Sequence, residues 1–336
     1  MTHVFTPTVD HAKSDRLLDM KKEVALYVGE ELGKYGFPEG HPFGPDRQAA
    51  FWKEAVKQGL DRRTEITDPR MAAQEELHRF HTPEHVAWVK DKSAEGYGSI
   101  DYGDTPAYHG VYEAAATVAG SALHGLDTIL SGGALRTFQP IGGLHHARPG
   151  GAAGFCVFND IGVVIQALRS QHGIRRVAYV DIDVHHGDGL YYPYEEDPDL
   201  IYADIHQDGR TLYPGTGHAH ETGKGAAKGT KLNIPMMPGM GDRDFFEEWE
   251  AVVRHVRKFK PEFILFQCGA DSLAGDPLAM LQYTPAAHAH AAKSLCALAN
   301  EMTGGRIMGF GGGGYNRANL AAAWCGVLDQ FIRGSE

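Results

Sequence analysis

The sequence predicts an α/β protein with a mainly parallel sheet that lies between two layers of helices. Three observations support this prediction. From about residue 135 onward, short apolar runs alternate with amphipathic helical segments. Four of these apolar runs are followed by clusters of glycine and ionisable residues. No Pro-, Ser- or Gly-rich linker divides the chain, so we expect residues 1–336 to form one domain, with the helix-rich segment 1–130 integral to it.

The first hundred residues are expected to be mainly helical. Apolar residues recur at helical spacing over 14–34, shortly before Gly36. Pro45 occupies a first-turn position for a helix over 45–58. Two further helices are predicted over 82–93 and 109–130.

The rest of the chain follows a strand, loop and helix pattern. The run 175–184 is rich in β-branched residues, and 262–268 (EFILFQC), with four consecutive apolar residues, is expected to form a buried strand. The predicted strands are 135–141, 175–184, 200–205, 231–236, 262–268 and 306–310. The predicted helices between and after them are 159–170, 244–259, 285–302 and 317–333.

Composition indicates an ordinary globular protein, since 43% of the 336 residues are hydrophobic and 22% are charged. The net charge of −11 without a long basic run argues against nucleic-acid binding and is compatible with cationic substrates. No apolar run approaches the length of a membrane span, and no signal peptide is visible. The four cysteines form no C-x-x-C pair, which fits a reducing compartment, so we expect a cytoplasmic protein without a membrane partner. The sequence does not decide the oligomeric state, which could be a monomer or a homo-oligomer.

Polar residues gather directly after four of the predicted strands. In a parallel sheet the ligand crevice lies at the carboxyl ends of the strands, so these four clusters are expected to converge on one site. Any single cluster could be a simple turn. The clusters are 142–151, 181–189, 269–277 and 311–316.

The segment 181–188, DIDVHHGD, predicts a metal site. Side chains two residues apart on a strand share a face, so Asp181, Asp183 and His185 point the same way. Asp183 and His185 can then reach one divalent cation, and Asp271 from another strand end gives a third ligand. Two Asp and one His leave the fourth position open, as a catalytic zinc site requires. The competing interpretation is a salt-bridged, solvated strand end.

The tandem pair His145 and His146 is a candidate for acid–base chemistry. Asp181 and Asp188 remain available as partners, and a carboxylate on one imidazole nitrogen fixes the tautomer and raises the basicity of the other. Tyr315 follows four glycines and could donate its hydroxyl to the oxyanion that forms when a carbonyl is attacked.

At these residues the sequence resembles the histone deacetylase superfamily, which includes acetoin-utilisation deacetylases and acetylpolyamine amidohydrolases. The similarity spans nearly the whole chain, and the motifs agree in order, spacing and identity. The matching stretches are YGFPEGHPFGPDR (35–47), GDTPAYHGVYEAA (103–115), GGLHHARPGGAAGFCVFND (142–160), VDIDVHHGDGL (180–190), LYPGTG (212–217), QCGADSLAGDPL (267–278) and GGGGYN (311–316).

The resemblance implies a single arginase-like α/β domain with an eight-stranded parallel sheet and a role for each site residue. Asp183, His185 and Asp271 match the zinc ligands. His145 and His146 match the tandem pair, with Asp181 and Asp188 as their respective carboxylates; His146 becomes the general base and His145 an electrostatic helper. Tyr315 becomes the tyrosine that polarises the acetyl carbonyl.

The resemblance also assigns a substrate tunnel. Gly154 and Phe155 match its wall, Asp104 matches the rim acid that binds the substrate backbone, and Leu278 belongs to the same substrate-binding set. Tyr213 departs from the family because it stands where a second tunnel Phe is usual, which makes the tunnel mouth more polar.

The cofactors implied are zinc, with ferrous iron as an alternative for the same ligands, and a structural potassium ion. Asp204 stands where many relatives carry Ser near that potassium. Backbone oxygens around Asp181, Asp183 and His185 could still hold the ion, with the Asp204 carboxylate strengthening it.

The function implied is that of a metal-dependent amidohydrolase that removes acetyl groups from linear amides, with acetyl-lysine in proteins or peptides as its expected partner. A small acetylated polyamine is the alternative substrate. A dinuclear arginase-type hydrolase and a non-catalytic acyl-lysine-binding protein are the more distant alternatives.

Overall fold

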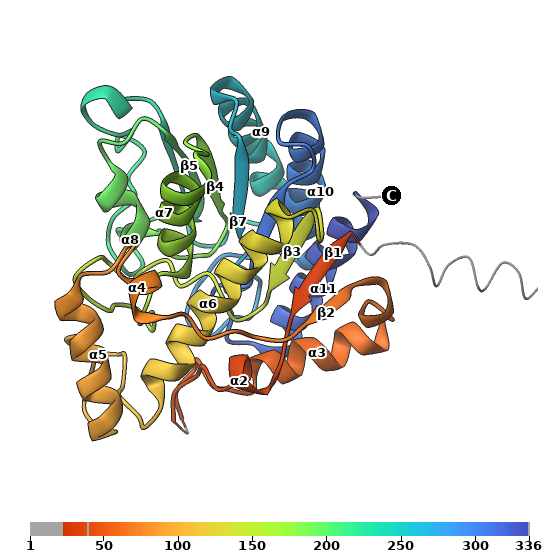
Figure 1. Cartoon of the computed structure of the whole chain (residues 1–336). Coiled ribbons are helices and arrows are strands. Elements are labelled where there is room, and N and C mark those ends of the chain that lie inside the picture. The colour runs from red at the N-terminus through yellow and green to blue at the C-terminus, as the bar shows by residue number, and fades with distance from the viewer. Residues whose placement is uncertain (1–22, 39, 335–336) are drawn as a thin grey trace, which may run out of the picture.

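The computed structural model describes residues 23–38 and 40–334, and its centre is one parallel eight-stranded sheet (Figure 1). The strand order is β2-β1-β3-β8-β7-β4-β5-β6, and every neighbouring pair is parallel. The strands are β1 (Val24–Tyr27), β2 (Glu65–Thr67), β3 (Arg136–Gln139), β4 (Val177–Asp181), β5 (Leu200–Gln207), β6 (Lys231–Met236), β7 (Phe263–Gln267) and β8 (Ile307–Phe310).

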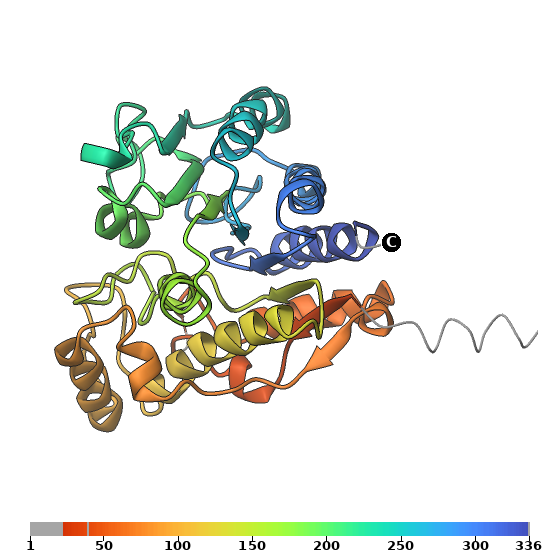
Figure 2. The same ribbon diagram turned by 45° about the horizontal axis from the view of Figure 1, so that its top comes forward.

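Helices cover both faces of the sheet, and Figure 2 shows α6 in yellow on the face opposite the blue C-terminal helices. Alternate strand residues divide between two cores, because successive side chains on a strand point to opposite faces. Val180 of β4 packs in the core that holds Trp249 of α9 and Trp324 of α11, whereas Tyr179 packs in a core with Leu126 of α6. The longer helices are α3 (Arg47–Lys57), α5 (Pro83–Glu95), α6 (Val111–Leu130), α7 (Asp160–His172), α9 (Asp242–Phe259), α10 (Pro285–Met302) and α11 (Arg317–Arg333). Three single-turn helices are α2 (Glu30–Gly33), α4 (Gln74–Leu77) and α8 (Asp188–Tyr191).

The predicted three-layer, single-domain α/β fold is therefore confirmed. Each of the six strands predicted after residue 135 exists as β3 to β8, and the four helices predicted with them are α7, α9, α10 and α11. The apolar run 262–268 does form a central, fully buried strand, β7, which lies between β4 and β8. A strand that is covered on both faces reads as a continuous apolar run, which is why its sequence was informative.

The helix predicted over 14–34 is wrong for the residues that the structure describes; residues 14–22 lie outside the described residues. Residues 24–27 form strand β1, between β2 and β3, and only the single turn α2 follows. The sequence VALY is buried throughout, so its apolar residues serve two faces of a sheet rather than one face of a helix. The edge strand β2 was also missed, since two of its three residues are exposed, the third is half-buried, and they carry no apolar run.

The sheet topology brings the four polar clusters together. Strands β3, β8, β7 and β4 are consecutive neighbours at the centre of the sheet. Their last residues are in register, with Gln139 and Gln267 both opposite Phe310 and Asp181 opposite Gln267. The loops that follow these strands therefore leave the sheet side by side, although residues 139 and 310 are far apart in the chain.

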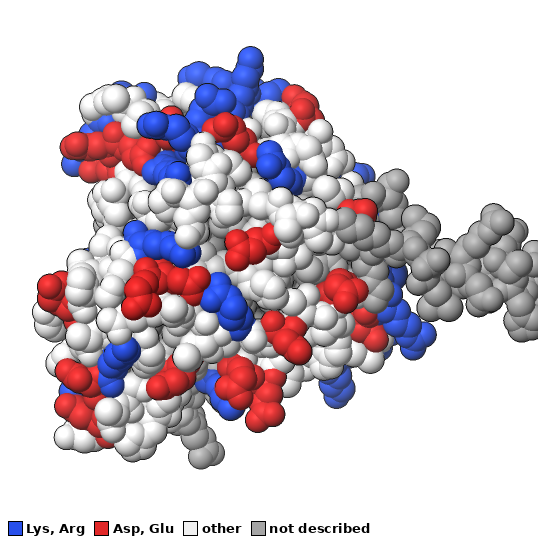
Figure 3. All heavy atoms as spheres, viewed as in Figure 1, with Lys and Arg blue, Asp and Glu red and all other residues white. Residues whose placement is uncertain are grey.

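The surface carries charges of both signs. On the face in Figure 3, Lys and Arg side chains are interspersed with Asp and Glu, and neither sign dominates that face. Among the helices of residues 23–38 and 40–334, none is both long and apolar enough to cross a membrane.

Candidate active site

Three buried side chains at the ends of β4 and β7 form a compact group of potential metal ligands. Asp183, His185 and Asp271 offer ligand atoms that all lie within 4.8 Å of one another. His185 Nδ1 is 3.1 Å from Asp183 Oδ1 and 3.2 Å from Asp271 Oδ2. Asp183 and His185 share a face of the chain as their spacing predicts, while Ile182 and Val184 pack in the core.

The surroundings of this group fit a bound cation. Asp183 Oδ2 accepts hydrogen bonds from Gln267 Nε2 and from the Gly313 backbone N–H, both at 2.8 Å, which fixes the carboxylate. Asp271 Oδ1 accepts from the Val184 N–H at 3.0 Å, whereas its buried Oδ2 accepts no hydrogen bond from residues 23–38 and 40–334. A buried carboxylate oxygen without a donor is rare unless an ion or water satisfies it. Two carboxylates and an imidazole suit zinc or ferrous iron.

The tandem histidines lie beside this group, each held by its own carboxylate. His145 Nδ1 is 2.8 Å from Asp181 Oδ2, and His146 Nδ1 is 2.7 Å from Asp188 Oδ1. The two Nε2 atoms face each other at 3.1 Å. All four side chains are buried, so these contacts are shielded from water.

The surroundings shift the pKa values of the two imidazoles in opposite directions. Burial alone would lower the pKa of His145, but the Asp181 and Asp183 carboxylates raise it to about 9. Burial and the neighbouring His145 lower the pKa of His146 to about 4, against the hydrogen bond to Asp188. The neutral His146 keeps its proton on Nδ1 toward Asp188, which leaves Nε2 as its acceptor nitrogen. His146 is thus the member of the pair that can accept a proton.

Tyr315 reaches the same place from the glycine-rich turn after β8. Its backbone N–H donates to Asp276 Oδ2 at 2.8 Å. The buried guanidinium of Arg47 holds the turn, since its Nε and Nη2 donate to the carbonyls of Gly314 and Gly312 at 2.9 and 2.5 Å. Burial and the Asp271 and Asp183 carboxylates raise the pKa of Tyr315 well above that of free tyrosine, so its hydroxyl stays a donor at neutral pH.

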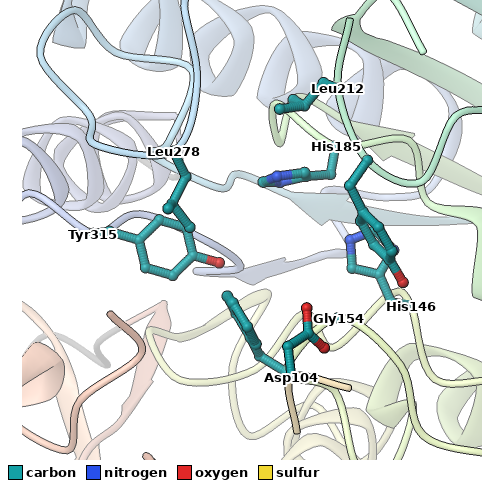
Figure 4. Close-up of a pocket in the computed structure, with 9 residues that line it drawn as sticks. Asp104, His146, Gly154, His185, Leu212, Leu278 and Tyr315 are labelled. Carbon is teal, nitrogen blue, oxygen red and sulfur yellow. The ribbon is translucent and has the colours of Figure 1, made fainter. Parts of the chain in front are cut away.

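A cavity of about 230 Å³ opens onto these side chains. Figure 4 shows the Tyr315 hydroxyl turned toward the cavity, with His185 and His146 on the other side. The structure brings all five predicted substrate-binding residues to its wall. The lining consists of Asp104, His146, Gly154, Phe155, His185, Leu212, Tyr213, Leu278 and Tyr315.

Gly154 keeps the cavity open. Its φ is +52°, and a Cβ at this position would lie 2.6 Å from the His146 ring and 3.0 Å from the Tyr213 ring. A side chain here would strain the backbone and press against both rings, so the wall requires glycine.

Sequence reasoning missed several residues that touch the site. Gln267 supports Asp183, Arg47 supports the turn below Tyr315, Arg148 Nη2 donates to Asp188 Oδ2 at 2.7 Å, and Leu212 lines the cavity. Arg47 and Arg148 do lie inside the quoted motifs 35–47 and 142–160. The sequence alone does not mark either arginine as part of the site, because a single arginine in a loop is usually exposed.

The Asp204 carboxylate is fully occupied by neighbours. One oxygen pairs with His206 Nδ1 at 2.6 Å, and the other accepts from the Tyr202 hydroxyl at 2.5 Å and the Gly187 N–H at 2.9 Å. All four groups are buried. Asp204 therefore organises a buried polar cluster behind His186 rather than presenting a free oxygen.

Comparison with known proteins decides the family. Residues 41–331 match the histone deacetylase domain. The acetoin utilization protein AcuC of Bacillus subtilis is 35% identical over 306 residues, which cover 88% of this chain and 78% of AcuC. The chain belongs to the histone deacetylase family.

Other relatives of this deacetylase-family chain include a yeast protein and a solved structure. Histone deacetylase RPD3 of Saccharomyces cerevisiae is 31% identical over 324 residues, covering 93% of this chain and 73% of RPD3. The crystal structure of the HDA15 HD domain superposes with a TM-score of 0.85 at 30% identity, covering 94% of this chain and 89% of that one. Members of this family are hydrolases that remove acetyl groups.

Proposed function

We propose that this chain is a zinc-dependent deacetylase that hydrolyses the acetyl amide of acetyl-lysine in peptides or proteins. One observation carries the proposal. The cavity that is lined by His146 and Tyr315 also contains His185, whose Nδ1 lies against the two carboxylates of the candidate metal group. A base, a hydrogen-bond donor and a metal site thus face the same enclosed space, as hydrolysis of an amide requires.

In the proposed reaction, Asp183, His185 and Asp271 hold zinc, which when bound polarises the acetyl carbonyl and lowers the pKa of the attacking water. His146 takes the proton of that water at Nε2, while Asp188 holds the other nitrogen and stabilises the imidazolium. Tyr315 donates its hydroxyl to the carbonyl oxygen as this becomes negative. His146 then gives its proton to the leaving amine.

Replacing Tyr315 with phenylalanine is expected to lower kcat by about 100- to 1,000-fold, as for the loss of one oxyanion donor, with little change in KM. The measurement is steady-state kinetics on an acetyl-lysine peptide. Tyr194→Phe is the matched control, because Tyr194 is also buried and its hydroxyl hydrogen-bonds Gln166, away from the cavity. Wild-type turnover by Tyr315→Phe would remove this residue from the mechanism.

Comparison of an acetyl-lysine peptide with acetylputrescine tests the substrate. We expect kcat/KM to be at least about 10-fold higher for the peptide, because Asp104 at the cavity wall can accept backbone N–H groups, and a hydrogen bond to a charged group contributes about 1.5–3 kcal/mol. Asp104→Asn should reduce this ratio. A preference for acetylputrescine would instead assign the chain to the polyamine class, and tight binding of acetyl-lysine without any turnover would support a non-catalytic binder.

Two further aspects of the proposal concern ions and location. A structural potassium ion would have to be held by backbone oxygens around Asp181, Asp183 and His185, since both Asp204 oxygens already accept hydrogen bonds. Ferrous iron is an alternative occupant of the catalytic group. We expect the protein to act in the cytoplasm, as one domain, on acetylated lysine or a small acetylated amine rather than on nucleic acid.

A further inference from the structure

A second, wider hollow adjoins the mouth of the catalytic cavity. It has a volume of about 550 Å³ and is lined by residues 101–104, Arg148 and residues 150–153, together with Tyr213. Asp104 and Tyr213 line both the hollow and the cavity, so the two spaces are continuous. A peptide that inserts its acetyl-lysine side chain into the cavity can place neighbouring residues in this hollow.

Arg148 is the one basic side chain among the residues that line this hollow, and its position is fixed from two sides. Its backbone forms a tight bridge with Gly151, with N–H to carbonyl distances of 2.8 and 3.2 Å. The His81 ring lies 3.1 Å from the Arg148 carbonyl oxygen. The guanidinium Nη2 donates to the buried Asp188 Oδ2 at 2.7 Å. A side chain held in this way loses little freedom when it binds a ligand.

The remaining donors of this guanidinium face outward. The Arg148 side chain is 57% exposed, and among the described residues its Nε and Nη1 have no hydrogen-bond partner. Asp188 engages only Nη2 of the guanidinium, because its other carboxylate oxygen accepts from His146 at 2.7 Å. The planar guanidinium offers paired N–H donors that match the two oxygens of a carboxylate.

The acids of the hollow do not occupy these donors. Asp101 accepts hydrogen bonds from Ser99, Gly103 and Thr105, so its carboxylate is used to fold its own loop. Asp104 remains exposed at the shared wall. The mouth therefore presents one acceptor for backbone N–H groups and one cationic donor for an anion.

From this arrangement we infer that Arg148 is a specificity-determining residue that binds a carboxylate beside the acetylated lysine. The preferred substrates are peptides in which acetyl-lysine is followed by Asp or Glu, or in which acetyl-lysine itself carries the free C-terminal carboxylate. This inference rests on the proposed function and narrows its substrate class. Acetylated polyamines carry no carboxylate and gain nothing from Arg148.

The test uses two amidated acetyl-lysine peptides that differ only in having Asp or Asn directly after the acetylated residue. With the zinc-loaded full chain, kcat/KM is about 3- to 10-fold higher for the Asp peptide, mainly through KM, and the ratio falls as salt rises. Arg148→Gln brings the ratio to about 1, whereas Arg148→Lys retains some of the preference. Arg175→Gln is the matched control, since Arg175 is also an exposed arginine paired with an aspartate, Asp199, but precedes β4 at the opposite end from the site.

The ratio of kcat/KM for the Asp peptide to that for the Asn peptide distinguishes binding of the substrate by Arg148 from support of His146 and Asp188 by Arg148. Loss of the contact with Asp188 lowers kcat for both peptides alike and leaves their ratio unchanged, so a purely structural Arg148 would not alter it. Equal kcat/KM for the Asp and Asn peptides in the wild type overturns the inference while the proposed function stands. If neither peptide is hydrolysed, the proposed function fails. The affinities of the two peptides are then compared by calorimetry, and equal affinities overturn the inference.

Discussion

Replacing His146 with alanine is expected to lower kcat by about 10²- to 10⁴-fold, the range for loss of a positioned general acid–base. His146 lines the cavity, and its Nδ1 is committed to Asp188 at 2.7 Å, so Nε2 is the nitrogen available for a proton. Burial keeps the pKa of this imidazole at about 4 in the resting protein, which leaves it neutral at physiological pH. The measurement is steady-state turnover of an acetyl-lysine peptide, with circular dichroism to show that the variant is folded.

His145→Ala is the natural comparison, because the two rings are neighbours of similar burial. His145 is hydrogen-bonded to Asp181, and the nearby carboxylates raise its pKa to about 9, so it carries a proton at neutral pH. We therefore expect it to act on the reaction through its positive charge. We expect a smaller loss of kcat than for His146→Ala. A larger loss in His145→Ala would exchange the roles of the two residues.

Asp271→Asn is expected to abolish tight zinc binding and to lower turnover by about 10³-fold or more, since the metal supplies several kcal/mol of transition-state stabilisation. Asp271 Oδ2 is a buried oxygen of the candidate metal group that no hydrogen-bond donor satisfies among the described residues. An amide can place a neutral oxygen or an N–H group there, and neither replaces the charge of the carboxylate. Asp197→Asn, at an aspartate paired with Arg169, is the control.

Metal content and thermal unfolding report on this site without reference to activity. The wild type should hold one zinc per chain, and zinc at 100 times its Kd stabilises the folded state by about 2.7 kcal/mol. The melting temperature of the wild type should therefore rise on addition of zinc, whereas that of Asp271→Asn should not. Two metals per chain would contradict the mononuclear site and favour an arginase-type centre.

Local sequence patterns predicted the central sheet and the candidate metal ligands, whereas the residues assigned to the substrate cavity followed from the family resemblance. Buried parallel strands such as β7 read as apolar runs. Asp183 and His185 do lie together as their alternate spacing predicts, although β4 ends at Asp181 and both residues belong to the loop that follows it. The convergence of the loops also followed, since the carboxyl ends of parallel strands share an edge.

The sequence could not predict features that depend on contacts between distant segments. Strand β1 was misassigned because VALY satisfies both helical and strand patterns, and only its position between β2 and β3 decides the outcome. Arg47 reaches the glycine turn across more than 260 positions of the chain, and Arg148 reaches Asp188 across 40. Such pairings are set by the fold, so a single sequence carries no local trace of them.

The place of β8 in the sheet has a consequence for the synthesis of the chain. This strand is the last to leave the ribosome, yet it lies between β3 and β7 and is the link that joins β2-β1-β3 to β7-β4-β5-β6. A nascent chain that ends before residue 307 already contains Asp183, His185 and Asp271, but its sheet is in two separate pieces and Tyr315 has not been made. Continuity of the sheet and completion of the proposed catalytic set therefore arrive in the same late step of translation, so that no product ending before β8 combines the candidate metal ligands with Tyr315.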